Sequence, residues 1–296
     1  MINLNGLAVA LATPFTSGGD VDFPAFRALV RHCVTGGVDT LVVLGSTGEA
    51  ATLLEDERDA LITATLEEAG GRNVVAGTGS NATRQTAAWT ARAQALGAHG
   101  ALVVTPYYNK PTPDGLVAHF AAVADAAPDL PIIAYNVPGR TGLNLAPAVL
   151  ARLWENPAVV AVKESSGNLS QIAEIGRTLP KGKTLLAGDD NLAVASIAVG
   201  ATGLVSVLGN ALPAETKRLV SLALDGKREE AIALQRQLLP LMDALFLESN
   251  PIPVKAALQQ LGLCGDAMRL PLVPASAATR ARLQETLATA RALEIA

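Results

Sequence analysis

The chain has 296 residues, of which 50% are hydrophobic and 17% are charged, so it can bury a large core and is not expected to be disordered. Its formal net charge of −4 and its pI near 5.5 argue against nucleic acid as a partner. Its two cysteines, Cys33 and Cys264, lie far apart in sequence, which predicts no disulfide framework and favours the reducing cytoplasm.

The N-terminal segment Gly6–Ala12 is apolar, but the first basic residue is Arg27. Without a positively charged n-region, this segment is not expected to be a signal peptide. The histidines His32, His99 and His119 lack the spacing of metal ligands, so we predict no metal site.

Eight short apolar runs recur along the chain, with helical stretches between them. They are Leu7–Leu11, Thr40–Leu44, Asn73–Gly77, Gly100–Val104, Pro131–Tyr135, Val159–Lys163, Thr184–Ala187 and Gly203–Val207. Their spacing averages roughly 28 residues, about the size of a βα unit, and eight units predict an α/β fold of the (β/α)8 TIM barrel type. A doubly wound sheet is the alternative, although its strand–Gly-x-Gly-x-x-Gly–helix fingerprint is missing.

Polar and glycine-rich loops follow several of these predicted strands, and in a barrel such loops gather at one end. The run GSTGE at residues 45–49 exposes backbone N–H groups that can hold a carboxylate or phosphate, although a simple turn is the alternative. All three tyrosines stand at strand ends: Tyr107 and Tyr108 follow the fourth strand, and Tyr135 ends the fifth. Phenols near a lysine can relay protons, and Arg140 in the next loop can hold a carboxylate in bidentate fashion.

Lys163 is the first charged residue after the apolar run at 157–162, which places it at the C-terminal end of the sixth strand. Such a lysine can be desolvated, and a neutral amine is what Schiff-base formation with a carbonyl substrate requires. A lysine that extends to solvent or pairs with Glu164 is the alternative that this residue alone leaves open.

Two acidic residues, Asp189 and Asp190, follow the seventh strand. Adjacent carboxylates can bind a metal, but the sequence after them fits a helix, so we favour acids that cap its N-terminus.

The segment between Asp190 and Glu215 carries no charge and is long enough to cross a bilayer. Its glycines and polar residues instead predict a helix at Asn191–Val199, a Gly-Ala-Thr-Gly turn and the eighth strand, so no membrane span is expected.

Beyond Asp225 the pattern predicts helices alone. The candidates are Lys227–Leu247, with a bend at Pro240, Pro251–Leu261 and Ala277–Ile295. We therefore expect a catalytic barrel at residues 1–225 and a C-terminal helical domain at residues 226–296.

Taken together, six motifs resemble the dihydrodipicolinate synthase family of pyruvate-dependent class I aldolases. They are GSTGE at 45–49, PYYNKP at 106–111, YNVPGRTG at 135–142, KESSGNL at 163–169, GDD at 188–190 and NPIPVK at 250–255. The resemblance covers nearly the whole chain. It implies a carbon–carbon lyase that condenses pyruvate with L-aspartate 4-semialdehyde in diaminopimelate and lysine biosynthesis, with no cofactor beyond a covalent imine.

The resemblance also implies catalytic roles for four residues. Lys163 would form the imine with pyruvate, and Tyr135 would move protons to and from it. Ser46 and Tyr108 would complete a hydroxyl relay, with Tyr108 reaching in from a partner subunit of a homotetramer built as a dimer of dimers.

Four further residues would bind substrate on the same resemblance. Thr47 and the neighbouring amides would hold the pyruvate carboxylate, and Arg140 would hold the carboxylate of the semialdehyde. Gly188 and the carbonyl of Val205 would lie beside the lysine.

One departure from the family keeps a second activity open. Ser46 stands where synthases usually carry threonine, and GSTGE is also common in N-acetylneuraminate lyases and 2-keto-3-deoxy sugar acid aldolases. Arg140 favours the synthase, because its charge suits a short carboxylated aldehyde better than a polyol. A non-catalytic pyruvate-binding protein is disfavoured by the intact lysine and tyrosines.

A second departure concerns feedback by lysine. Lysine-inhibited relatives use histidines and a glutamate at positions that here hold Glu55, Arg58 and Gln85, although Asn81 and Tyr107 remain. Loss of that glutamate removes a charge-assisted contact of roughly 1.5–3 kcal/mol, so we predict weak or absent lysine inhibition.

Overall fold

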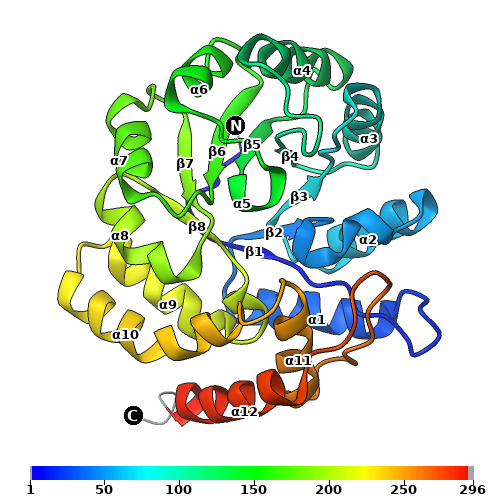
Figure 1. Cartoon of the computed structure of the whole chain (residues 1–296), viewed down its shortest axis with the longest axis vertical. Coiled ribbons are helices and arrows are strands. Elements are labelled where there is room, and N and C mark those ends of the chain that lie inside the picture. The colour runs from blue at the N-terminus through cyan, green and yellow to red at the C-terminus, as the bar shows by residue number, and fades with distance from the viewer. Residues whose placement is uncertain (1, 293–296) are drawn as a thin grey trace.

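Eight parallel strands close into a barrel in the computed structural model, which describes residues 2–292 (Figure 1). The strands are β1 (Gly6–Ala10), β2 (Thr40–Val43), β3 (Asn73–Gly77), β4 (Gly100–Val104), β5 (Ile132–Asn136), β6 (Val159–Glu164), β7 (Thr184–Ala187) and β8 (Gly203–Ser206). Because β1 pairs with both β2 and β8, the predicted barrel is confirmed and the doubly wound alternative is wrong. Each predicted strand matches an observed strand, with no end displaced by more than one residue.

Short and long helices follow the strands around the barrel. They are α1 (Phe23–Thr35), η1 (Ser46–Gly48), η2 (Ala50–Thr52), α2 (Glu55–Glu68), α3 (Thr83–Ala95), α4 (Pro113–Ala126), α5 (Pro138–Thr141), α6 (Pro147–Leu153), α7 (Leu169–Thr178), η3 (Asp190–Leu192), α8 (Ala193–Ala198), η4 (Leu208–Asn210) and α9 (Pro213–Leu224). The short α5 lies over the opening of the barrel in Figure 1.

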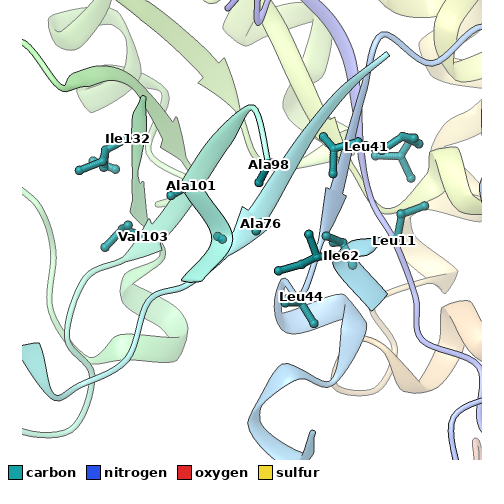
Figure 2. Packing of buried hydrophobic residues seen from close by; sticks show 14 of the residues in the cluster. Leu11, Leu41, Leu44, Ile62, Ala76, Ala98, Ala101, Val103 and Ile132 are labelled. Atoms are coloured by element: carbon teal, nitrogen blue, oxygen red, sulfur yellow. The ribbon is translucent and has the colours of Figure 1, made fainter. Parts of the chain in front are cut away.

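Strand side chains alternate between two buried clusters, which is why the strands read as continuous apolar runs. Ala8 and Ala10 belong to the cluster inside the barrel, whereas Leu7 and Val9 belong to the cluster between strands and helices. Figure 2 shows part of this outer cluster, where side chains of neighbouring strands meet Ile62 of α2. The alternation of side chains along each strand therefore decides which residues face the barrel interior.

Three helices follow the barrel: α10 (Arg228–Ala244), α11 (Ile252–Gln260) and α12 (Ala277–Arg291). The three predicted C-terminal helices are therefore confirmed, with α10 running through Pro240; the predicted end at Ile295 lies outside the described residues. Their apolar faces share a cluster with α9 and the loop after β8, so the C-terminal helices are packed on this side of the barrel.

The uncharged segment between Asp190 and Glu215 forms η3, α8, a turn, β8, η4 and the start of α9, so the predicted order of helix, turn and strand is confirmed. Between residues 2 and 292, no helix combines the length and apolar character that crossing a membrane requires. Cys33 is fully buried in the core, and burial raises the pKa of its thiol to about 12.

Candidate active site

A cavity of about 270 Å³ opens at the C-terminal end of the barrel strands. Its polar wall comes from the loops after β2, β4 and β5, and it includes Ser46, Tyr107, Tyr135 and Arg140. The structure thus brings three of the predicted site residues to one cavity, because all of these loops leave the same end of the barrel.

Lys163 and Tyr135 lie side by side on β6 and β5. They are paired in the strand register, and the amine Nζ of Lys163 lies 4.2 Å from the centroid of the Tyr135 ring. Both side chains are buried, at 6% and 7% exposure. The Tyr135 ring lines the cavity, so the amine lies against a residue of the cavity wall.

Glu164, the next residue on β6, points to the opposite side of the strand. Its carboxylate accepts hydrogen bonds of 3.1 and 2.9 Å from Nδ2 of Asn136 and another from the amide of Ser166. Neighbouring strand residues face opposite sides, so the alternative that Lys163 pairs with Glu164 is wrong.

Gly188 lies beside the Lys163 side chain. A Cβ at Gly188 would lie 3.0 Å from Cε of Lys163 and would collide with Oγ of Ser165. Only glycine leaves this space, and Val205 is buried inside the barrel in the cluster that contains Tyr135.

The GSTGE run forms the one-turn helix η1 beside the cavity. Ser46 lines the cavity, whereas the hydroxyl of Thr47 accepts a 2.9 Å hydrogen bond from Nδ2 of Asn250. Within the described residues, neither the amide of Ser46 nor that of Thr47 donates a hydrogen bond to the protein. Two adjacent free N–H groups suit a carboxylate.

Arg140 projects from α5 at the rim of the cavity. Its Nη2 donates a 2.9 Å hydrogen bond to the carbonyl of Asn250, which leaves the rest of the guanidinium available to an anion. Asn250 thus contacts both Thr47 and Arg140. Sequence reasoning assigned it no role, although it begins the NPIPVK motif.

Tyr108 does not join the other predicted site residues. Its side chain is 89% exposed and its φ is +72°, whereas its neighbour Tyr107 lines the cavity. A role for Tyr108 from a partner subunit therefore stays a prediction.

The acidic pair after β7 does not cap its own helix, so that prediction is wrong. Asp189 precedes η3 without a capping hydrogen bond. The buried Asp190 instead accepts hydrogen bonds from Oγ of Ser206 and from the amides of Val207 and Leu208, at 2.9 and 3.0 Å for the amides. Because β7 and β8 are neighbours in the barrel, the carboxylate of Asp190 reaches the loop that follows β8. No group of three or more His, Cys, Asp or Glu among residues 2–292 is placed to hold a metal ion.

Asp189 carries a perturbed carboxyl group near the lysine. Burial raises its pKa to about 6, with Asp190 and Glu164 adding to the effect and Lys163 opposing it. The sequence did not predict that Asp189 lies near Lys163, because the two residues come together only through the pairing of β6 with β7.

We expect this carboxyl group to favour folding in acid. Its pKa in the folded chain is about 6 against an ordinary value of 3.8, so its contribution is complete below pH 3.8 and is lost as the pH rises through about 6. An Asp189→Asn variant should exceed the parent in free energy of unfolding at pH 8 by at most about 3 kcal/mol, and the difference should shrink toward zero near pH 4. Urea unfolding at several pH values measures this, with the exposed Asp125→Asn as control. A pH-independent difference would contradict the expectation.

The family model for the dihydrodipicolinate synthetase family matches residues 3–290. The 4-hydroxy-tetrahydrodipicolinate synthase of Thermomicrobium roseum is 48% identical over 287 residues, which cover 97% of this chain and 94% of that protein. The protein of the same name from Methylococcus capsulatus is 44% identical over 291 residues, covering 98% of this chain and 100% of the relative.

Solved structures agree with this relationship. The dihydrodipicolinate synthase of Thermotoga maritima has a TM-score of 0.94 at 40% identity and covers 97% of this chain and 98% of its own. The chloride-inhibited enzyme of Acinetobacter baumannii, complexed with pyruvate, has a TM-score of 0.95 at 38% identity, with coverages of 98% and 99%. The enzyme of Cyanidioschyzon merolae with lysine bound has a TM-score of 0.94 at 39% identity, with coverages of 97% and 98%. This chain belongs to the dihydrodipicolinate synthetase family.

Proposed function

We propose that this chain is a 4-hydroxy-tetrahydrodipicolinate synthase that joins pyruvate to L-aspartate 4-semialdehyde through an imine on Lys163. The observation that carries the proposal is the pair of Lys163 and Tyr135, buried side by side at the end of the barrel where the cavity opens. The full-length similarity to proteins named for this reaction supports it.

The reaction begins at the amine of Lys163. Its neutral form attacks the ketone carbon of pyruvate, and loss of water gives an imine. Removal of a methyl proton gives an enamine, whose carbon attacks the aldehyde of the second substrate. The amino group of that substrate then attacks the imine carbon and displaces the amine of Lys163, which closes the ring of the product and frees the lysine. We assign these proton transfers to the hydroxyl of Tyr135, whose ring lies against the amine, and Ser46 and Tyr108 would extend the relay toward solvent. The reaction needs no cofactor beyond this imine.

Two binding groups hold the substrate carboxylates. The free amides of Ser46 and Thr47 suit the carboxylate of pyruvate, which must stay fixed while the adjacent ketone reacts. Arg140 at the rim suits the carboxylate of the semialdehyde, since a guanidinium binds such a group with two parallel hydrogen bonds.

One experiment separates this activity from the related sugar-acid lyase or aldolase. The protein is incubated with pyruvate and borohydride, the labelled residue is found by mass spectrometry, and turnover is compared on aspartate semialdehyde and on sugar aldehydes. We expect label on Lys163 and turnover on the semialdehyde. Label with turnover on sugar aldehydes alone would favour the lyase, and absence of label would contradict both enzymes.

We also propose that the chain works in the cytoplasm as a homotetramer in which the partner subunit's Tyr108 completes each relay. An exposed tyrosine in the left-handed backbone region supports this arrangement, because a contact with a second copy would compensate its strain. Sedimentation velocity at several concentrations tests the assembly, and a monomer that retains full turnover would contradict it.

We predict that lysine inhibits this enzyme weakly or not at all. A cavity of about 220 Å³ beside the active site is lined by Glu55, Arg58, Gln85 and Trp89, among others. The guanidinium of Arg58 lies 3.9 Å over the Trp89 ring; burial lowers its pKa to about 10, so it stays cationic at neutral pH. The carboxylates of Glu55 and Asp59 also line the cavity, but they interact with Arg58, whose cation repels a cationic ligand, and Gln85 offers no anion to the α-ammonium group.

Initial rates at increasing lysine concentration measure this insensitivity. The rate should fall by less than half at about 1 mM lysine, whereas the double variant Arg58→His/Gln85→Glu should become more sensitive. Half-inhibition of the parent below that concentration would overturn the prediction.

A further inference from the structure

A buried ion pair lies outside the groups that the reaction uses. Nζ of Lys255 on α11 is 2.7 Å from Oε1 of Glu49, and the two side chains are 0% and 1% exposed. The same Nζ lies 4.3 Å from the ring centroid of Phe15, so the lysine is enclosed by apolar and charged neighbours at once. Burial lowers the pKa of Lys255, while the nearby Glu49 opposes that effect. Two fully desolvated charges are costly to bury, and an apolar pair of similar size would often stabilise a fold equally well.

Glu49 is placed to control the shape of the η1 turn. It ends η1 and begins η2 in the left-handed conformation, at φ +52° and ψ +34°, which is unfavourable for a residue with a side chain. Its amide donates to the carbonyl of Ser46, and its Oε2 accepts a 3.2 Å hydrogen bond from the amide of Arg269. The side chain of Glu49 therefore ties the turn to two segments of the C-terminal region.

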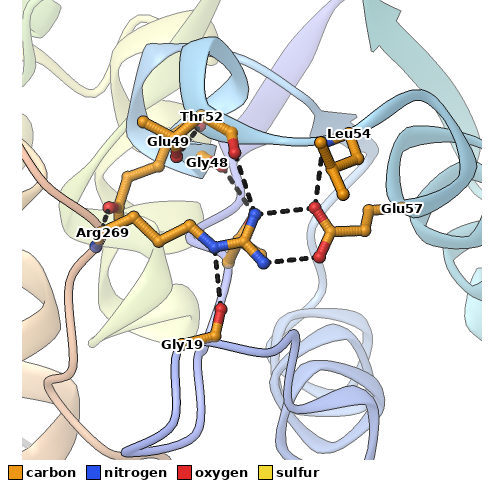
Figure 3. Close-up of polar contacts among 8 residues, drawn as sticks. Gly19, Gly48, Glu49, Thr52, Leu54, Glu57 and Arg269 are labelled. Atoms are coloured by element: carbon orange, nitrogen blue, oxygen red, sulfur yellow. Dashed lines mark hydrogen bonds and ion pairs between the residues drawn. The ribbon is translucent and has the colours of Figure 1, made fainter.

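Arg269 strengthens the same attachment (Figure 3). Its guanidinium forms an ion pair with Glu57 of α2 and donates to the carbonyls of Thr52 and Gly19, at 2.9 and 2.8 Å. Together with the bond from Asn250 to Thr47, three C-terminal residues hold η1 and η2. Of these contacts, the ion pair between Lys255 and Glu49 is the one whose two side chains are both fully buried.

We propose that the Glu49–Lys255 pair is a positioning device for the carboxylate of pyruvate. The pair holds η1 so that the free amides of Ser46 and Thr47 keep their place beside the cavity. Anion binding by backbone amides depends on such preorganisation, because a small displacement weakens both hydrogen bonds together. This inference rests on the proposed function, since it takes pyruvate as the ligand of the turn.

The test removes both charges and follows pyruvate separately from the aldehyde. In the double variant Glu49→Gln/Lys255→Met, neither charge is left buried without a partner, so the variant is expected to fold with stability near that of the parent. Borohydride trapping at increasing pyruvate concentration gives the half-saturating concentration and the maximal rate of labelling at Lys163. We expect the half-saturating concentration to rise about 10- to 100-fold. The maximal labelling rate and the KM for the semialdehyde should stay within about threefold, because Lys163 and Arg140 are untouched.

Two further variants keep the test decisive. Glu49→Asp retains the charge but withdraws the carboxylate by one methylene, so it should raise the half-saturating concentration by a smaller factor. Lys217→Met breaks the ion pair between Lys217 and Asp39, at the opposite end of the barrel; it should lower the stability and leave pyruvate saturation unchanged.

Two results would overturn the inference while the proposed function stands. In the first, the double variant has the same half-saturating pyruvate concentration as the parent. In the second, the half-saturating pyruvate concentration, the KM for the semialdehyde and the maximal labelling rate all worsen in proportion to a loss of stability. A parent chain that forms no adduct at Lys163 would overturn the proposed function, and the inference with it.

Discussion

Replacing Lys163 with alanine is expected to abolish the pyruvate adduct and to lower kcat by about 10³-fold or more, because no other amine can take over the covalent step. The side chain is 6% exposed and its Nζ lies against the Tyr135 ring, so a surface lysine has no comparable access to the cavity. Borohydride trapping followed by peptide mass mapping measures the adduct, and steady-state kinetics measures turnover.

The matched control for this variant is Lys181→Ala, which removes an exposed lysine near the start of β7. It should label and turn over like the parent. Since removing a buried side chain can lower stability, thermal unfolding must show that Lys163→Ala is folded under the assay conditions. A folded variant that still labels with pyruvate would place the reactive lysine elsewhere.

Replacing Tyr135 with phenylalanine is expected to slow turnover by about 10²- to 10⁴-fold while changing pyruvate binding little. Phenylalanine keeps the ring over the Lys163 amine, at 4.2 Å in the parent, and removes only the hydroxyl. The loss should therefore appear in kcat and in the rate of imine formation. The half-saturating pyruvate concentration, which depends on η1, should stay within a few-fold.

Stopped-flow trapping separates these quantities. Tyr107→Phe is the matched control, because Tyr107 lines the same cavity but is not stacked on the lysine. The Tyr107→Phe variant should lose much less of the parent's kcat than the Tyr135→Phe variant does. Equal turnover in the Tyr135→Phe variant and the parent would refute the proton role of the phenol.

Much of the fold followed from local patterns in the sequence. Each strand is buried on both sides, so it reads as a short apolar run, and helices recur between the runs at the spacing of βα units. The same logic placed Lys163, Tyr135 and the GSTGE turn at one end of the barrel, because parallel strands all end there.

Other predictions failed or stopped short because they depend on residues brought together from different strands. Asp190 was expected to cap the helix that follows it, but its carboxylate turns to the loop after β8, which the closed sheet places beside it. The environment of Asp189 likewise depends on its neighbours across β6 and β7, and no local pattern describes such a contact.

The sequence by itself determined where the strands and helices lie along the chain and placed Lys163 at the end of a strand, because periodicity and strand ends are local properties of the chain. Only the tertiary structure decided how the turn at η1 is held. The contacts from Asn250 to Thr47 and from Lys255 to Glu49 join residues more than 200 positions apart. Such pairs form only after the barrel has closed and α11 has packed beside it, so no spacing within the sequence specifies them.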